Sequence, residues 1–169
     1  MARPFSSLPG RLMQALAAAG LFLVLAAAAA SAQGDIEHKR AVAAANQAFY
    51  AALRARDLDA MDRLWAKKTT VSVIHPGWVT LVGRDAVMAS WDQIMRSGGI
   101  GEIAPLRPVI LLLHASAVVL NYERGGAAED GGYRAATNVF ILEEGAWRML
   151  HHHAGPAPGA VGLSRGAPR

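Results

Sequence analysis

Apolar side chains recur every third or fourth residue in three stretches of the chain, and each stretch is therefore predicted to form a helix with one buried face. The first helix is expected over about 35–56, where alanine-rich sequence raises the helix propensity further. A shorter second helix follows Asp57, whose carboxylate can accept hydrogen bonds from the free N–H groups of a first turn. The third helix is expected to begin at Gly83 and to end at Gly98 and Gly99, because glycine commonly terminates helices.

Stretches rich in β-branched residues predict strands between and after these helices. Two short strands, 69–74 and 78–82, flank a turn marked by Pro76 and Gly77. Longer strands are expected after the third helix, at about 102–114, 116–124, 132–143 and 146–153. This order of elements predicts an α+β domain in which a curved antiparallel sheet wraps helices on one face.

The beginning of the chain, residues 1–32, has the pattern of a secretory signal peptide. Its only charges are Arg3 and Arg11, and the run 12–30 is apolar apart from one glutamine and one glycine. Ala-Ser-Ala at 30–32 supplies the small residues that a signal peptidase needs. We therefore expect the mature chain to begin at Gln33 and to be periplasmic or secreted, without membrane attachment after cleavage. The alternative is a retained membrane anchor, since the run approaches the length of a membrane span.

The charge and composition of the remaining chain exclude some classes of function. The whole chain has 17 Lys and Arg against 13 Asp and Glu, and loss of the two N-terminal arginines lowers the net charge from +4 to +2. The basic residues are scattered, which argues against nucleic acid as a partner. No cysteine is present, so disulfides and thiolate chemistry are excluded. One folded domain is expected over 33–154, followed by a disordered Pro/Gly/Ala-rich tail over 155–169.

Several motifs between about 41 and 156 resemble a known family. They are FYAALRARDL (49–58) with Trp65, HPG (75–77), GRDAVMASW (83–91), TNVF (137–140), GAW (145–147) and HHHA (151–154). Together they are similar to the SnoaL-like branch of the nuclear-transport-factor-2-like superfamily, which also includes ketosteroid isomerase and scytalone dehydratase. The resemblance implies a cone-shaped α+β fold, with a curved sheet around three helices and an internal pocket.

The resemblance leaves the activity open, because this superfamily contains isomerases, dehydratases, cyclases, hydrolases and plain binding modules. Ketosteroid isomerase pairs an aspartate base with a tyrosine and a protonated aspartic acid. That trio cannot be placed on this chain, because neither Tyr122 nor Tyr133 has an aspartate at a matching position.

His75 is the candidate catalytic residue. It ends a predicted strand just before Pro76, and an imidazole can act as a base, an acid or a hydrogen-bond donor near neutral pH. The alternative is a turn histidine bonded to the backbone. Two tryptophans are candidates for ligand binding. Trp91 either lines the pocket from the third helix or belongs to the core, and Trp78 either covers the pocket mouth or lies exposed.

The other ligand-binding candidates lie on the long strands. Glu123 is a candidate base with a raised pKa if it faces inward, and a solvated charge if it faces outward. Asn138 lies in a β-branched strand, and because its amide is costly to bury unpaired, we expect it to contact a partner or a ligand. Phe140 is expected in the apolar lining, and His152 is expected on the face of Asn138.

The loop before the last strand decides which side chains share the pocket face. If 143–145 form a three-residue loop, Leu142 pairs with Ala146. That register places three residues on one face, Asn138, Phe140 and His152, and three on the other, Thr137, His151 and His153. A two-residue loop would instead pair Asn138 with His151 and exchange the faces. We favour the three-residue loop.

Metal and cofactor chemistry have weak support in the sequence. His151 and His153 point the same way on a strand and could hold Zn²⁺ with His75, but no cysteine or carboxylate lies at a suitable spacing. No phosphate loop, dinucleotide motif or nucleophile elbow is present. We therefore expect neither a metal nor a cofactor.

The sequence thus predicts an exported protein that binds a small apolar or amphipathic molecule in a pocket. The alternative is a lyase, isomerase or hydrolase that uses a histidine general base on a small carbonyl or polyketide-like substrate, with Asn138 orienting the substrate. A homodimer that forms through the exposed face of the sheet is compatible with both functions.

Overall fold

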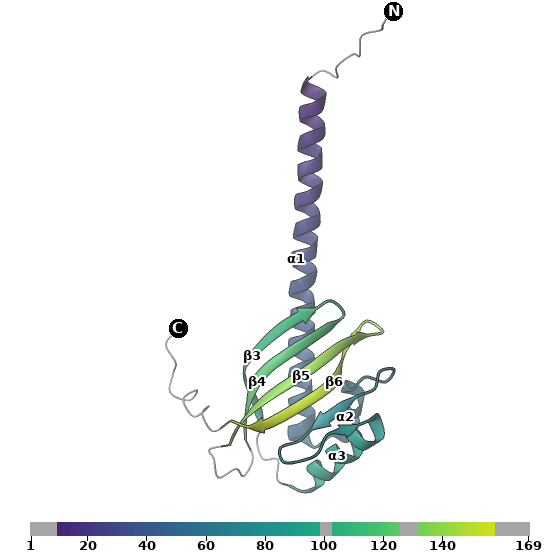
Figure 1. Cartoon of the computed structure of the whole chain (residues 1–169), viewed down its shortest axis with the longest axis vertical. Helices are drawn as coiled ribbons and strands as arrows, with labels where there is room; N and C mark the ends of the chain where they lie inside the picture. The colour runs from purple at the N-terminus through teal and green to yellow at the C-terminus, as the bar shows by residue number, and fades with distance from the viewer. Residues whose placement is uncertain (1–9, 99–102, 126–131, 158–169) are drawn as a thin grey trace, which may run out of the picture. The chain divides into compact units, whose positions relative to one another are not determined.

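The structure, a computed structural model, describes residues 10–98, 103–125 and 132–157, with side chains from residue 29 onward. It divides into two compact units, Met1–His38 and Lys39–Arg169. Helix α1 (Gly10–Ala55) contributes its first part to one unit and its last part to the other (Figure 1). No described helix combines the length and the hydropathy that crossing a membrane requires. Residues 1–9 lie outside the described part, and the signal peptide stays a prediction.

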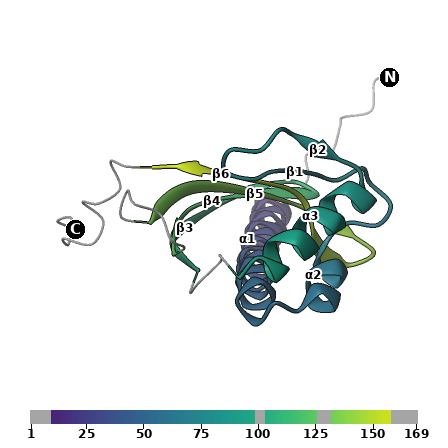
Figure 2. The same ribbon diagram turned by 90° about the horizontal axis from the view of Figure 1, so that it is seen from below.

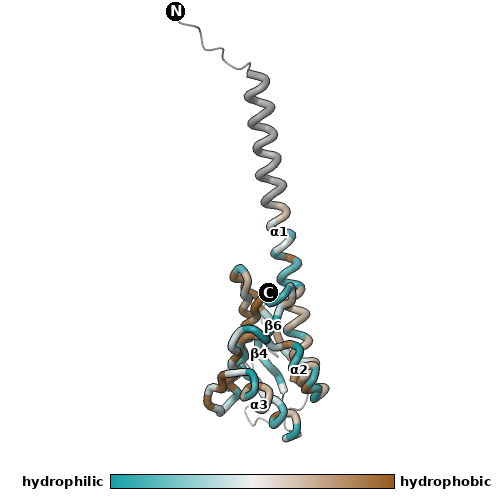
Figure 3. The backbone as a smooth tube through the Cα atoms, turned by 90° about the vertical axis from the view of Figure 1, so that its right-hand side faces the viewer, coloured by the Kyte–Doolittle hydropathy of each residue, from teal (hydrophilic) through white to brown (hydrophobic). Residues whose placement is uncertain are grey.

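The second unit is built on one six-stranded sheet in the order β2-β1-β6-β5-β4-β3. Its strands are β1 (Ser72–Ile74), β2 (Leu81–Val82), β3 (Ala104–Leu113), β4 (Ser116–Arg124), β5 (Tyr133–Glu143) and β6 (Ala146–Pro156). Neighbouring strands are antiparallel except β1 and β6, which run parallel, so the sheet is mixed. Figure 3 shows the hydrophobic stretches, in brown, within the strands of this unit.

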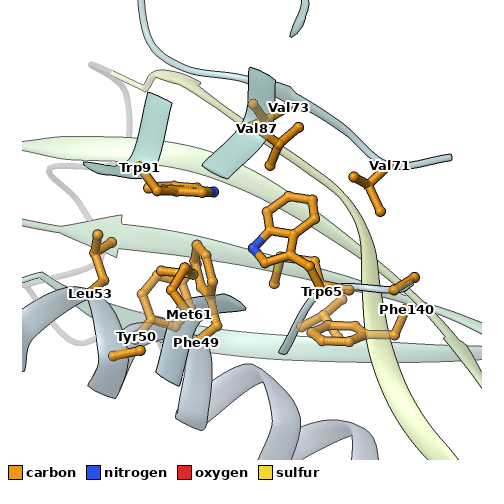
Figure 4. Close-up of a cluster of buried hydrophobic side chains, with 14 of the residues drawn as sticks. Phe49, Tyr50, Leu53, Met61, Trp65, Val71, Val73, Val87, Trp91 and Phe140 are labelled. Atoms are coloured by element: carbon orange, nitrogen blue, oxygen red, sulfur yellow. The ribbon is translucent and has the colours of Figure 1, made fainter. Parts of the chain in front are cut away.

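Helices cover one face of this curved sheet. In Figure 2 the last part of α1, α2 (Leu58–Leu64) and α3 (Arg84–Arg96) all lie on the same side of the strands. The hydrophobic core lies between the two layers (Figure 4). Its largest fully buried side chains include Trp65, Tyr50, Phe49, Phe140, Met61 and Met149. The predicted α+β fold, a curved sheet around three helices, is confirmed.

Polar side chains hold both ends of the short helix α2. At its start, the Asp57 carboxylate accepts a first-turn N–H at 2.8 Å, as predicted for a capping residue. At its end, the Arg84 guanidinium donates to four acceptors: the carbonyl oxygens of Asp62, Trp65 and Ala66, and the Asp62 carboxylate. Because carbonyl groups at a helix end have no partner within the helix, Arg84 satisfies them and thereby joins α3 to α2.

The short β1–β2 hairpin is smaller than predicted. Of the expected strand 78–82, only Leu81–Val82 pairs in the sheet. The chain before it forms a turn in which the Trp78 N–H donates to the His75 carbonyl oxygen at 3.0 Å, with Gly77 at a φ of 79°. A positive φ favours glycine, so this turn depends on the residue type at position 77.

Strand β6 is longer than predicted. It continues past position 154 to Pro156, because Gly155 and Pro156 pair with Ala135 and Arg134 of β5. The strand therefore includes the first two residues of the predicted tail. The rest of the predicted disordered tail, 158–169, lies outside the described residues.

The turn between β5 and β6 corrects the predicted register. It has two residues, Glu144 and Gly145, with positive φ values of 52° and 78°, and Glu143 pairs with Ala146. Two positive φ angles match the twist of the flanking strands, which makes such a turn common in hairpins. The predicted three-residue loop is therefore wrong, and by itself this turn would exchange the two faces of β6.

A β-bulge restores the predicted faces. Phe140 opposes Met149, whereas the preceding Val139 opposes His151, so Leu150 is an extra residue on β6. Beyond the bulge Asn138 opposes His152, and both side chains lie on the inner, helix-covered face. The two residues thus share a face as predicted, but through a different register.

The outer face of the sheet carries exposed apolar side chains along its β3 edge. Val109, Leu111 and Leu113 of β3 are each about half exposed, and Leu120 of β4 pairs with Val109. Exposed apolar residues in a contiguous stripe often mark an interaction surface. The homodimer expected through this face stays a prediction.

The hydrogen bonds of Arg84 lead to a prediction about stability. Arg84→Met is expected to lower the free energy of unfolding by about 1–3 kcal/mol, because it leaves partly buried carbonyl groups without their charged donor. Urea denaturation followed by circular dichroism measures this loss. The control is Arg96→Met, which removes only an exposed ion pair with Asp92 and should lower the free energy of unfolding much less than Arg84→Met does. Equal losses in the two variants would contradict the role of Arg84.

Candidate functional site

A cavity of about 250 Å³, called the pocket below, opens between the inner face of the sheet and the helices. Its apolar walls include Leu53, Trp78, Trp91, Ile94 and Ile103. Its polar lining includes His75, Glu123, Arg134 and His152. Five of the predicted site residues therefore line one cavity: His75, Trp78, Trp91, Glu123 and His152.

Two predicted ligand-binding residues do not line the pocket. Phe140 is fully buried in the core, where it opposes Met149 and lies near Trp65 (Figure 4). It is on the hairpin side of Asn138, whereas Arg134 lines the pocket toward the other end of β5, so Phe140 is too far along the strand. Asn138 is also fully buried, and its amide is bonded to protein groups behind the lining.

His75 is buried in the pocket wall with its ring nitrogens in defined roles. The Ser90 hydroxyl donates its one hydrogen to the Val87 carbonyl oxygen at 2.7 Å, so it accepts from His75 Nε2 at 2.9 Å. The remaining nitrogen, Nδ1, can then only accept. The ring contacts Trp78 and Trp91 edge-on, with centroids 5.1 and 4.5 Å away.

Burial lowers the pKa of His75 to about 4, because the charged imidazolium loses its hydration. His75 is therefore neutral at physiological pH. A base with so low a pKa takes up a proton weakly, so His75 is better suited to accept a hydrogen bond than to serve as the predicted general base.

Glu123 faces inward and is the acidic group of the pocket. It is 2% exposed, and its Oε1 accepts the Tyr50 hydroxyl hydrogen at 2.7 Å. Burial raises the pKa of Glu123 to about 7, although the Tyr50 hydrogen bond and the charge of Arg134 act in the opposite direction. The inward alternative of the sequence analysis is therefore the correct one, and this carboxyl group can gain or lose a proton near neutral pH.

A chain of buried hydrogen bonds connects His152 to Glu123. His152 Nδ1 and Asn138 Oδ1 are 2.6 Å apart, and the Asn138 amide nitrogen donates to Asn46 at 2.7 Å. Asn46 donates to Asn121 at 3.4 Å, and Asn121 donates to the Tyr50 hydroxyl oxygen at 2.8 Å. The chain ends with the hydrogen bond from Tyr50 to Glu123. In order, its members are His152, Asn138, Asn46, Asn121, Tyr50 and Glu123.

The direction of this chain determines which nitrogen of His152 carries the hydrogen. Tyr50 has one hydroxyl hydrogen and directs it to Glu123, so each amide donates toward Tyr50 and each amide oxygen accepts from the residue before it. His152 must then donate from Nδ1 to Asn138, which leaves Nε2 with a lone pair. Burial also lowers the pKa of His152 well below its usual value, so the ring stays neutral.

His152 Nε2 and Glu123 Oε1 are 3.9 Å apart, a distance too long for a direct hydrogen bond. Both atoms belong to residues that line the pocket. The imidazole of His152 and the carboxyl group of Glu123 therefore lie near each other in the pocket without a direct hydrogen bond.

Three residues of this chain, Asn46, Tyr50 and Asn121, were missed by the sequence analysis. Asn46 and Tyr50 are four residues apart and so share one face of a helix, and Asn121 is two residues before Glu123 and so shares its face of the strand. These two spacings could have indicated from the sequence that each pair of residues shares a face. Tyr122 and Tyr133, the two tyrosines considered for a pair with a carboxyl group, lie on strands, whereas Tyr50, which bonds Glu123, lies on α1.

The histidines considered for zinc are not brought together. His151 and His153 lie on the outer face of β6, where His151 Nδ1 contacts the Ser72 hydroxyl at 2.8 Å. His75 and His152 lie on the inner face. The absence of a metal stays a prediction.

A family model for the SnoaL-like domain matches residues 42–158, which is more than half of the chain. The chain belongs to the SnoaL-like family. The resemblance stated from the motifs is therefore confirmed.

Solved structures of related proteins have the same SnoaL-like architecture. A candidate dehydratase of the NTF2-like family from Streptomyces avermitilis is 30% identical, with a TM-score of 0.61 over 70% of this chain and 94% of that one. A candidate calcium/calmodulin-dependent protein kinase type II association domain from Thiobacillus denitrificans is 34% identical, with a TM-score of 0.61 over 68% of this chain and 93% of that one.

A curated relative has a different name again. The F-box protein SKIP8 of Arabidopsis thaliana is 32% identical over 117 residues, which are 68% of this chain and 49% of that protein. The chain thus spans about half the length of this relative. The relatives differ in name although each is similar to this chain, so the function of this chain must be argued from its own pocket.

The raised pKa of Glu123 predicts how stability depends on pH. Its pKa is about 7 in the folded chain against 4.5 for an exposed glutamate, so Glu123 contributes stability below about pH 4.5 that is lost as pH rises through about 7. Glu123→Gln removes this titration. The free energy of unfolding of the variant, relative to the wild type, should therefore rise by about 3 kcal/mol between about pH 4.5 and about pH 8.

Urea denaturation at several pH values measures this difference, and groups that titrate in both proteins cancel. Glu144→Gln, which changes an exposed carboxylate of the hairpin turn, is the matched control and should show little dependence on pH. A difference between Glu123→Gln and wild type that is constant over this pH range would contradict the raised pKa.

Proposed function

We propose that this chain binds a small, largely apolar molecule in the pocket. The observation that carries the proposal is the open cavity of about 250 Å³ with tryptophan, leucine and isoleucine walls. Concave, mostly apolar sites with a few polar groups are typical of small-molecule binding. A cavity of about 150 Å³ can hold benzene, so this pocket is suited to a molecule of one or two rings.

The polar groups of the pocket are compatible with an uncharged or amphipathic ligand. His75 and His152 are neutral, and Glu123 is close to half protonated at neutral pH. Arg134 opposes Glu123 across β4 and β5, so the two charges offset each other when the carboxyl group is ionised.

The second candidate function is acid–base catalysis on the bound molecule. It is favoured by Glu123, whose pKa of about 7 suits a group that both accepts and donates a proton near neutral pH. The related protein from Streptomyces avermitilis is named as a candidate dehydratase, which is in keeping with this chemistry. In this chain Glu123, rather than the predicted His75, would be the general base, because the pKa of His75 is about 4.

The binding proposal is tested with a panel of uncharged one- and two-ring compounds, measured by saturation-transfer NMR. Compounds that bind the wild type should fail to bind Ile94→Trp, because the larger side chain fills the pocket from α3. Gln93→Trp is the matched control: it places the same indole on an exposed position of the same helix, outside the pocket lining, and should leave binding intact.

Binding that survives Ile94→Trp, or a panel without any ligand for the wild type, would contradict the proposal. Product analysis of each bound compound separates the two functions. A product formed by the wild type and lost in Glu123→Gln supports catalysis, whereas compounds recovered unchanged support a binding protein.

We also propose that the chain is exported and that its mature form begins at Gln33. This rests on the apolar run and the Ala-Ser-Ala triplet before that residue. Mass spectrometry of the protein recovered from its native host should find a periplasmic or secreted chain that starts at Gln33. An intact chain that starts at Met1 in the membrane fraction would support the retained anchor instead.

A further inference from the structure

We infer that the ligand of the pocket carries an uncharged hydroxyl group, which accepts a hydrogen bond from Glu123 and donates one to His152. The ligand class is therefore a one- or two-ring alcohol rather than an ether, an amine or a carboxylate. This inference rests on the proposed binding function and adds the chemical group that the pocket recognises.

The first observation is the open end of the buried hydrogen-bond chain. His152 donates from Nδ1 into the chain, so its Nε2 has no hydrogen and can only accept. At the other end Glu123 accepts from Tyr50. The two ends of the hydrogen-bond chain lie close together, with 3.9 Å between His152 Nε2 and Glu123 Oε1. One group that accepts from Glu123 and donates to His152 would close the chain into a ring.

The second observation is that the protein does not fill this position itself. Within the described residues, Tyr50 gives its one hydroxyl hydrogen to Glu123, and the amide groups of Asn46, Asn121 and Asn138 donate to other members of the hydrogen-bond chain. A 3.9 Å separation is too long for a direct bond between the two ends. His152 lines the pocket, so a ligand hydroxyl group there can donate its hydrogen to the Nε2 lone pair.

The third observation is the charge around Glu123. Four groups face it from different elements: Tyr50 of α1, Arg134 of β5, His152 of β6, and His75 beyond the end of β1 in the same pocket. Arg134 is the only cation among the four, and Tyr50 and both histidines are neutral. A protonated amine would add a second positive charge beside Arg134 in an apolar pocket, whereas an alcohol adds none.

A ligand hydroxyl group can bond both His152 and Glu123 in these roles only when the Glu123 carboxyl group is protonated. The carboxyl group then donates to the ligand oxygen, and the ligand hydrogen is free for His152. Because the pKa of Glu123 is about 7, this state is populated below neutral pH and is lost above it. Binding of an alcohol should therefore weaken as pH rises, while His75 and His152 remain neutral over that range.

The test compares four probes with the same ring system: 2-naphthalenemethanol, its methyl ether, 2-naphthylmethylamine and 2-naphthoate. Isothermal titration calorimetry on the full-length wild-type protein gives each Kd at about pH 6 and about pH 8.5. The alcohol should bind about tenfold more tightly than the ether at the lower pH, which is the scale of one hydrogen bond, and this advantage should shrink at the higher pH.

Glu123→Gln provides a variant that preserves the geometry. The glutamine oxygen can accept from Tyr50 and its amide can donate to the ligand oxygen, so the preference for the alcohol should persist and become independent of pH. Glu144→Gln, on the exposed hairpin turn, should behave as wild type.

The outcomes distinguish this inference from the proposed function. If the ether, the amine or the naphthoate binds the wild type as tightly as the alcohol, or if the preference for the alcohol does not change with pH, the hydroxyl inference is wrong while binding in the pocket stands. If none of the four probes binds, the result counts against both.

Discussion

Burial of Glu123 is the constraint on which the site depends. A carboxyl group that is 2% exposed must be satisfied by protein groups or ligand, since an unpaired buried charge is very costly. Tyr50 meets this need on one side, but its own hydroxyl oxygen is then buried and needs a donor, which Asn121 supplies. Each asparagine oxygen is buried in turn and also needs a donor. Asn46 donates to Asn121, Asn138 donates to Asn46, and His152 donates to Asn138. Five other buried polar residues thus form one connected set of hydrogen bonds that ends at this carboxyl group in the pocket lining.

This arrangement requires side chains from one helix and three strands to meet within hydrogen-bond distance. Asn46 and Tyr50 come from α1, Asn121 and Glu123 from β4, and the other two members from β5 and β6. The β-bulge at Leu150 is what places His152 in the chain, because a regular ladder after the two-residue turn would direct its ring to the outer face. Bulges often re-aim a side chain next to a functional site, and this one does so for the ring nitrogen that borders the pocket.

The family relationship and the site give different kinds of information. The chain belongs to the SnoaL-like family and is similar to proteins named as a candidate dehydratase, a candidate kinase association domain and an F-box protein, so family membership does not identify what the pocket holds. In the proposed function, the ligand is selected by the protonation states of a few residues: neutral His75 and His152, and Glu123 near its midpoint at neutral pH. These states come from burial and from hydrogen-bond direction, which relatives with the same fold need not share.

The sequence by itself determined the features that depend on neighbouring residues. Helical spacing, the Asp57 cap and the long strands were predictable, because they rest on local periodicity and on contacts within a few positions. Family motifs added the curved sheet and the pocket, and five of the candidate residues proved to line it. The tertiary structure alone decided the rest. The bulge at Leu150, the inward face of Glu123 and the role of Tyr50 depend on pairings between segments far apart in the chain, and a shift of one residue in register exchanges every inner side chain for an outer one. Phe140 was predicted in the pocket lining but lies in the core. The strand pattern shows which side chains face inward, whereas only packing against the helices shows where along the strand the core ends and the cavity begins.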